Sequence, residues 1–202
     1  MHEPKSALDS LRAKINESLR SSLPFSDMKN KVIEAMRYAV LAPGKRIRPI
    51  LMLEIARILR HDQEAIVPSA CAIEFIHTAS LILDDLPCMD NAVLRRGQNA
   101  THLVFGEAIA ILAAIALILH AFNLIQGNAL HAEIGKEEMG KMFLSLYQKT
   151  GLEGMITGQN FDLSSPEIPF SVVMLTRPLR YSKSLSKQPV FSARLQKRKG
   201  NP

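Results

Sequence analysis

Apolar residues recur at intervals of three and four along most of the chain, and this spacing restricts the possible fold more than any other feature. It places the apolar side chains on one face of an α-helix, whereas a half-buried strand would alternate residue by residue. No stretch shows a clear strand alternation, and no internal repeat is visible. We therefore predict an all-α bundle of packed helices. Breaks between helices are expected at Pro24, Pro43-Gly44, His61-Asp62, Pro87, Arg96-Gly97 and after Leu163.

The most hydrophobic segment is the run of 11 residues from Ile109 to Leu119, between Glu107 and His120. This is shorter than the roughly 18 residues that a membrane-spanning helix requires. We interpret it as a buried core helix and predict no membrane span. The N-terminal segment MHEPKSALDSLRAKINESL mixes charged and apolar residues at helical spacing, so neither a signal peptide nor a transit peptide is indicated.

The chain has two cysteines, Cys71 and Cys88, whose positions show no pairing pattern. Free thiols are typical of reduced compartments, because disulfides persist mainly in secreted proteins. We expect a cytoplasmic location, and a plastid location stays open for a related source.

The net charge of +6 is concentrated at one end of the chain. Residues 171–202 hold eight lysines and arginines and no acidic residue, which leaves 17 basic against 19 acidic residues in 1–170. The basic segment also loses helical periodicity and is rich in serine, which is typical of weak order. We predict a folded portion over 1–170 and a poorly ordered tail over 171–202. Contact of the tail with RNA or anionic lipid is an open alternative, but the acidic body argues against a nucleic-acid-binding function.

Three carboxylates follow an apolar helix that is predicted from about Val67 to Leu86. Asp84 and Asp85 are adjacent, and Asp90 can fold back towards them after Pro87 interrupts the helix. The negative end of a helix dipole repels carboxylates, so three of them there favour a bound cation. Hard oxygen donors suit Mg²⁺, which is commonly held by one or two carboxylates together with phosphate oxygens. A solvated acidic helix end is the alternative.

Basic residues near these acids favour a phosphate ligand. Arg95 and Arg96 follow in the segment LRRG, and the segment PGKRIRP supplies Lys45, Arg46 and Arg48. Arginine binds phosphate oxygens with two parallel hydrogen bonds, and a helix N-terminus next to the second segment would add an anion site. His77 precedes Asp84 by seven residues and therefore lies on the same helix face. A structural and a functional role are both open for this histidine.

Several segments, in this order, resemble the trans-prenyltransferases, which are the polyprenyl (farnesyl and geranylgeranyl) diphosphate synthases. The resemblance runs from about Lys31 to Leu163, and the Asp84-Asp85-x4-Asp90 spacing is similar to the first aspartate-rich motif of bacterial and plastid-type geranylgeranyl diphosphate synthases. The segments that carry it are GKRIRP, EFIHTASLILDDLPCMDNAVLRRG, HLVFGEA and GMITGQNFDL. The resemblance implies a helical bundle of the isoprenoid synthase type around a deep central cavity.

The resemblance also implies a reaction and a role for each site residue. An allylic diphosphate ionises, and the double bond of isopentenyl diphosphate attacks the carbocation. Mg²⁺ held by the catalytic residues Asp84, Asp85 and Asp90 would stabilise the leaving diphosphate. By correspondence, Arg95 would also hold the allylic diphosphate. The residues implied for isopentenyl diphosphate are Lys45, Arg48, His77 and Arg96.

Ala79 and Ser80, one turn before Asp84, correspond to the positions that control product length in the family. Small side chains there imply a product longer than farnesyl diphosphate, with geranylgeranyl diphosphate expected. A large aromatic side chain would instead close the path of the growing chain, since overpacking a close-packed wall is costly.

The sequence departs from the family pattern beyond Gly158-Gln159. The second aspartate-rich motif and a Lys-Thr pair that the family carries downstream are not found, and the resemblance ends at about Phe170. Two interpretations therefore stay open. One is a geranylgeranyl diphosphate synthase, or its N-terminal portion with the C-terminal helices missing. The other is a non-catalytic relative that binds diphosphates or pairs with a complete synthase subunit. A homodimer is also expected, because family members commonly dimerise.

Overall fold

A computed structural model describes residues 6–25 and 29–164. The predicted tail, residues 171–202, lies outside these ranges, so its weak order stays a prediction. The described residues divide into two units, with the boundary between Leu146 and Tyr147. All the candidate site residues belong to the first unit, and α8 (Met155–Ser164) belongs to the second.

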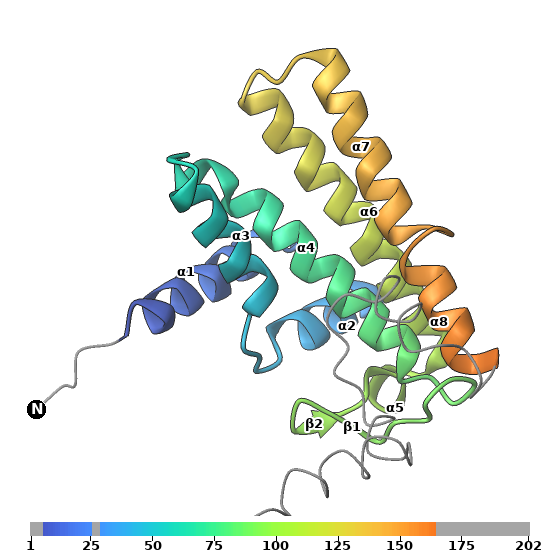
Figure 1. The fold of residues 1–202 in the computed structure, drawn as a ribbon. Helices are drawn as coiled ribbons and strands as arrows, with labels where there is room; N and C mark the ends of the chain where they lie inside the picture. Colours follow the sequence, from blue (N-terminus) through green and yellow to red (C-terminus); the bar gives the residue numbers. More distant parts are fainter. Residues whose placement is uncertain (1–5, 26–28, 165–202) are drawn as a thin grey trace, which may run out of the picture. The chain divides into compact units, whose positions relative to one another are not determined.

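The described residues are mostly helical, with one short two-stranded hairpin, which confirms the predicted all-α class (Figure 1). Breaks between helices occur at the predicted positions up to Arg96-Gly97, whereas the break expected after Leu163 borders residues outside the described ranges and stays a prediction. Further breaks at Gly106, 132–135 and 151–154 were not predicted. The remaining elements are α1 (Ala7–Ser22), α2 (Lys31–Leu41), α3 (Ile47–Ile58), α4 (Gln63–Asp84), β1 (Leu94–Arg95), β2 (Gln98–Asn99), α5 (Thr101–Phe105), α6 (Glu107–His131) and α7 (Lys136–Thr150).

Side-chain caps fix the starts of three helices. The Ser6 hydroxyl accepts from the backbone N–H of Asp9, Asn30 Oδ1 accepts from the first turn of α2, and Asp62 Oδ1 accepts from the N–H of Glu64. These bonds satisfy N–H groups that have no partner inside the helix. They therefore define where α1, α2 and α4 begin.

Helix α4 is the centre of the first unit and packs against α6 and α3 (Figure 1). Its apolar face includes the fully buried Phe75 and Ala79, and α6 presents alanines such as Ala113 and Ala114. Alanine at a helix contact lets two helices approach closely, and close packing maximises dispersion contacts. The long α4 is thereby held firmly, and the side chains at its C-terminal end are held with it.

Helix α6 is longer and more exposed than the sequence analysis predicted for Ile109–Leu119. His120 does not end the run, because its ring stacks on Phe75 and its Nε2 lies 2.6 Å from the carbonyl oxygen of Ser22. One face of α6 is buried, as predicted, but the opposite face leaves large apolar side chains exposed. These are Ile111, Leu112, Ile115, Leu119 and Leu130.

Two helices, α4 and α6, are long and apolar enough to cross a membrane by length and composition alone. The core helix of a globular protein meets the same criterion. In α4, 56% of the most apolar window is buried within the fold, and in α6 the share is 33%. The burial of α4 favours a core helix, and the predicted lack of a membrane span stays a prediction.

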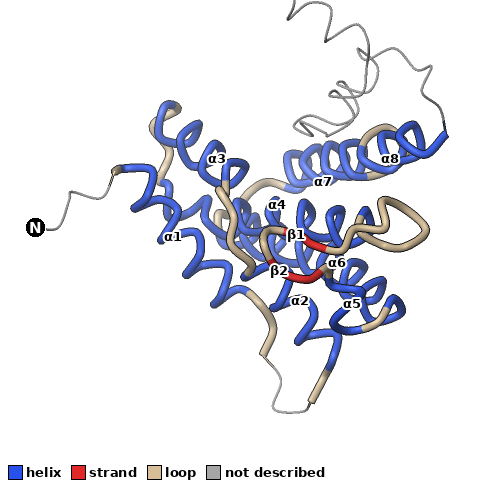
Figure 2. The backbone as a smooth tube through the Cα atoms, turned by 90° about the horizontal axis from the view of Figure 1, so that it is seen from below, coloured by secondary structure: helices blue, strands red, loops and turns tan. Residues whose placement is uncertain are grey.

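A two-stranded hairpin follows the C-terminal end of α4 (Figure 2). Strands β1 and β2 pair antiparallel, with Leu94 opposite Asn99 and Arg95 opposite Gln98. The turn consists of Arg96 and Gly97, both with positive φ (55° and 82°), which suits the twist of a two-residue hairpin. The sequence indicated a break here, but the strands are too short to show an alternation.

Candidate functional site

The predicted aspartates lie where α4 ends. The helix stops at Asp84, and Asp85 is its C-cap. Both side chains are buried, whereas Asp90 is exposed on the following loop. The loop does fold back as predicted, because the backbone N–H of Asp90 donates to the carbonyl oxygen of Asp84 at 2.9 Å. The three residues are therefore brought to one end of α4, at different depths.

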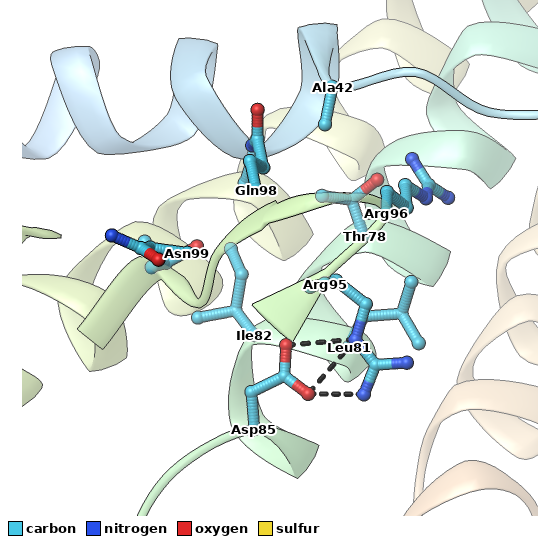
Figure 3. A pocket seen from close by; sticks show the side chains of 11 residues that line it. Ala42, Thr78, Leu81, Ile82, Asp85, Arg95, Arg96, Gln98 and Asn99 are labelled. Carbon is cyan, nitrogen blue, oxygen red and sulfur yellow. Dashed lines mark hydrogen bonds and ion pairs between the residues drawn. The ribbon is translucent and has the colours of Figure 1, made fainter. Parts of the chain in front are cut away.

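Asp85 is paired with Arg95 from β1 (Figure 3). Arg95 Nε lies 3.0 Å and 2.9 Å from the two carboxylate oxygens, and Nη2 donates to one of them as well. The hydrogen bond that Arg95 donates to Asp85 raises the pKa of Arg95, burial opposes this effect, and the charges of Asp84 and Asp90 add smaller increases. A residue predicted to bind diphosphate is thus held beside the residues predicted to bind metal.

The donor set at the end of α4 suits magnesium that is shared with a ligand. Carboxylate oxygens are the hard donors that Mg²⁺ prefers. Among the described residues, no group of three or more acidic, histidine or cysteine side chains is assembled as a metal site. Mg²⁺ is usually held by one or two carboxylates, waters and phosphate oxygens rather than by an all-protein cage. Asp84 and Asp85, with Asp90 beside them, would hold such an ion together with a diphosphate.

Arg46 is buried and has a structural role, although the sequence placed it with the phosphate-binding residues. Its Nη1 donates to Glu74 at 2.8 Å, its Nε donates to Asn16, and its Nη2 donates to the carbonyl oxygens of Val40 and Ala42, all at 2.8 Å. Every guanidinium nitrogen therefore donates within the fold. The residue also caps α3 in a left-handed conformation, with φ of 52°.

Lys45 and Arg48 flank Arg46 at the start of α3, as predicted. Lys45 is exposed and Arg48 is half-buried. Burial lowers the pKa of Arg48, the charge of Glu74 raises it, and the charge of Arg96 lowers it. Arg48 and Arg96 thus repel one another across the same carboxylate, although they belong to segments almost fifty residues apart.

Arg96 completes this group from the hairpin turn. Its Nη2 donates to Glu74 Oε1 at 3.3 Å, while its buried Nη1 has no hydrogen-bond partner among the described residues. Burial lowers its pKa most, and the charge of Glu74 opposes that effect. The sequence analysis did not identify Glu74 as a partner of these arginines. The available signal was an acidic residue inside an otherwise apolar helical segment.

The remaining predicted residues lie along α4. His77 and Ser80 are half-buried, and the Ser80 hydroxyl donates to the carbonyl oxygen of His77 at 2.9 Å. Ala79 has no exposed surface and belongs to the core of the first unit. The two positions predicted to control product length therefore differ in accessibility, and Ser80 is the more open of the two.

A small pocket lies between α2, α4 and the hairpin (Figure 3). Asp85, Arg95 and Arg96 line it on one side, and Thr78 and Gln98 are also among its lining residues. The buried Thr78 hydroxyl has no hydrogen-bond partner among the described residues. The hairpin forms the polar wall of the pocket, and this wall contains both Arg95 and Arg96.

Comparison with known proteins identifies the family. The family model described as polyprenyl synthetase matches residues 29–181. The chain is 45% identical over 163 residues to a geranylgeranyl diphosphate synthase of Pseudescherichia vulneris, covering 80% of this chain and 52% of the relative. It is 44% identical over 161 residues to a heterodimeric geranylgeranyl pyrophosphate synthase large subunit 2 of Arabidopsis thaliana, covering 80% and 42%.

Solved structures agree with the sequence comparison. An FPP/GFPP synthase of Zymomonas mobilis superposes with a TM-score of 0.77 at 32% identity, covering 88% of this chain and 65% of that structure. A geranyltransferase of Legionella pneumophila gives a TM-score of 0.78 at 29% identity, covering 85% and 63%. The chain spans about half the length of the curated relatives it matches. From its sequence and its fold, the chain belongs to the polyprenyl synthetase family.

Proposed function

We propose that this chain binds isopentenyl diphosphate and an allylic diphosphate and takes part in their condensation to a geranylgeranyl-type diphosphate. The observation that carries the proposal is the convergence of Arg46, Arg48 and Arg96 around Glu74. Three guanidiniums around one carboxylate leave two positive charges, and a diphosphate complements that excess. The relatives named geranylgeranyl diphosphate synthase support the same substrate class.

The proposed roles follow from the position of each side chain. Lys45, Arg48 and Arg96 would hold the diphosphate of isopentenyl diphosphate, with His77 on the neighbouring face of α4. Arg95 would turn from Asp85 to the allylic diphosphate, which frees a carboxylate for the metal. Magnesium, when bound, supplies Lewis-acid stabilisation of the departing diphosphate.

The apolar helices have a role in the same proposal. An allylic carbocation reacts with water unless water is excluded, and side chains such as Leu81 and Ile82 on α4 would line a dry path beside the aspartates. Proton loss from the condensed carbocation would then complete the reaction.

A second candidate function is binding without catalysis, in partnership with a synthase subunit. Two features favour it: the apolar side chains exposed on α6, and relatives whose names describe heterodimeric large subunits. In this case, the chain would retain diphosphate binding and contribute a surface to the partner.

Incorporation of radiolabelled isopentenyl diphosphate, with and without Mg²⁺, tests the proposal on this chain. Product formed only with Mg²⁺ supports the enzyme. Calorimetry then separates the two candidates, because diphosphate binding without product favours the partner role. The double variant Asp84→Ala/Asp85→Ala should lose Mg²⁺-dependent binding of an allylic diphosphate. If the parent binds neither diphosphate, both candidate functions are wrong.

A further inference from the structure

Glu74 is a buried acid to which the proposed chemistry assigns no task. It lies on α4, three residues before His77 and ten before Asp84, and therefore on the same face of the helix. Its side chain is 2% exposed. A single oxygen, Oε1, accepts from Arg46 at 2.8 Å and from Arg96 at 3.3 Å. Because an unpaired buried carboxylate is costly, these two guanidiniums compensate its charge.

The two arginines use Glu74 differently. Arg46 donates from all three nitrogens to the fold, so Glu74 is one of several anchors. Arg96 donates to Glu74 from Nη2, and its buried Nη1 has no hydrogen-bond partner among the residues that the structure describes. Glu74 therefore fixes one edge of the Arg96 guanidinium and leaves a donor at the other edge.

Gly44 brings the loop before α3 against the same pair. A Cβ at this position would lie 3.2 Å from Arg46 Nη1 and 3.3 Å from Arg96 Cζ, both closer than ordinary contact. The loop that carries Lys45 thus packs directly on the hairpin turn. Glu74 stands at the junction of these two segments, and each segment supplies cations to the candidate diphosphate site.

We propose that Glu74 is a positioning residue for isopentenyl diphosphate: it joins the 43–46 loop to the hairpin turn and orients Arg96 towards the ligand. This inference rests on the proposed function, since it assumes that Arg96 contacts a diphosphate. Glu74 itself touches no ligand. Its carboxylate holds the guanidinium in place and reduces its repulsion with Arg48.

Calorimetry with isopentenyl diphosphate, and separately with inorganic pyrophosphate, tests the inference on the full chain. Glu74→Gln should weaken binding of both by roughly tenfold, because the charge-assisted hydrogen bond that holds Arg96 becomes a weaker bond to a neutral amide oxygen. Glu54→Gln is the matched control, because Glu54 pairs with Arg57 on α3, away from the cluster. The Glu54→Gln variant should bind both ligands with the affinity of the parent.

Repeating Glu74→Gln in two variant proteins distinguishes an effect that acts through Arg96 from a general loss of structure. In an Arg96→Ala background, Glu74→Gln should cause no additional loss, because the group through which it acts is gone. In a Lys45→Ala background, the loss should remain roughly tenfold, since additivity holds for groups that do not act through one another. Equal losses in both backgrounds would overturn the inference.

Glu74→Gln leaves Arg46 with a weaker partner, so a paired variant guards against misfolding. Replacing a buried ion pair by apolar residues of similar volume is often tolerated. Glu74→Leu/Arg46→Met should therefore unfold cooperatively by circular dichroism and still bind roughly tenfold more weakly. If Glu74→Gln or the double variant binds as tightly as the parent, or if both fail to fold, the positioning role of Glu74 is wrong and the proposed function still stands. Absence of binding by the parent overturns the proposed function with it.

Discussion

Arg95 and Asp85 form a pair in which the guanidinium Nε lies within 3.0 Å of both carboxylate oxygens. Arg95, which is proposed to bind the allylic diphosphate, therefore neutralises Asp85, which is proposed to bind the metal. If these proposed roles hold, binding of the metal or of the diphosphate weakens the pair. With the roles proposed above, the pair would oppose metal binding until a diphosphate is present to accept hydrogen bonds from Arg95.

The first prediction follows from this opposition. Arg95→Gln should tighten binding of Mn²⁺, used as a probe for Mg²⁺, by roughly tenfold without diphosphate, because the competing cation is removed. The same variant should weaken binding of an allylic diphosphate. Electron paramagnetic resonance of Mn²⁺ measures the first effect and calorimetry the second.

The control for this prediction is Arg57→Gln, which alters an exposed pair on α3. It should leave both affinities unchanged. Weaker Mn²⁺ binding by Arg95→Gln would contradict the idea that Arg95 and the metal compete for Asp85.

Much of the fold could be predicted from the sequence, because helical spacing and helix-breaking residues are local signals. The partners of Arg46 could not, because Glu74 lies 28 residues away and no local pattern reports that contact. The exposed face of α6 was also missed. The hydrophobicity of a helix predicts that it is buried, but it does not identify which element packs on each of its faces. The proximity of the aspartates to Arg95 was foreseeable, since ten residues and one turn separate them.

The second prediction concerns stability and the role of Arg46. Arg46→Ala should lower the free energy of unfolding by roughly 3–5 kcal/mol, because it leaves the carboxylate of Glu74 buried with less compensation. Urea unfolding monitored by circular dichroism measures the change. Arg57→Ala removes an exposed cation and should leave the midpoint unchanged. An equal, small effect of both variants would show that the buried pair contributes little.

The third prediction uses the two thiols. Burial raises the pKa of Cys71 to about 11, while Cys88 is exposed on the loop after α4. At pH 8, about one Cys71 in a thousand is a thiolate, and the thiolate is the reactive form. Iodoacetamide should therefore modify Cys88 within minutes and leave Cys71 intact, as read by mass spectrometry of peptides. In urea both should react, and early labelling of Cys71 in the folded chain would contradict its burial.

The fourth prediction concerns product length. Ala79 has no exposed surface, so Ala79→Tyr should overpack the core and destabilise the fold by roughly 1–3 kcal/mol. Ser80 is half-buried on α4, and Ser80→Tyr should fold normally. If this chain, or a longer protein containing it, is active, Ser80→Tyr should shorten the product, and chromatography of dephosphorylated products measures this. Unchanged product length would exclude Ser80 as a determinant.

The fifth prediction concerns the exposed face of α6. Leu112, Ile115 and Leu119 follow one another at intervals of three and four and form an apolar stripe along the helix. A stripe of this kind on a folded surface favours association, because burying each such side chain contributes about 1.5–3 kcal/mol. We expect the purified chain to self-associate at micromolar concentration when it is alone, as measured by sedimentation velocity.

Leu119→Lys should weaken this association by roughly tenfold or more, because a charge would be buried in the contact. Leu8→Lys on α1 is the matched control, since Leu8 is a singly exposed leucine (55% exposed, against 65% for Leu119). A parent that sediments as a compact monomer, or equal effects of the two lysines, would show that the stripe does not mediate association. If the parent associates and Leu119→Lys disperses it, α6 is the surface on which a second subunit packs.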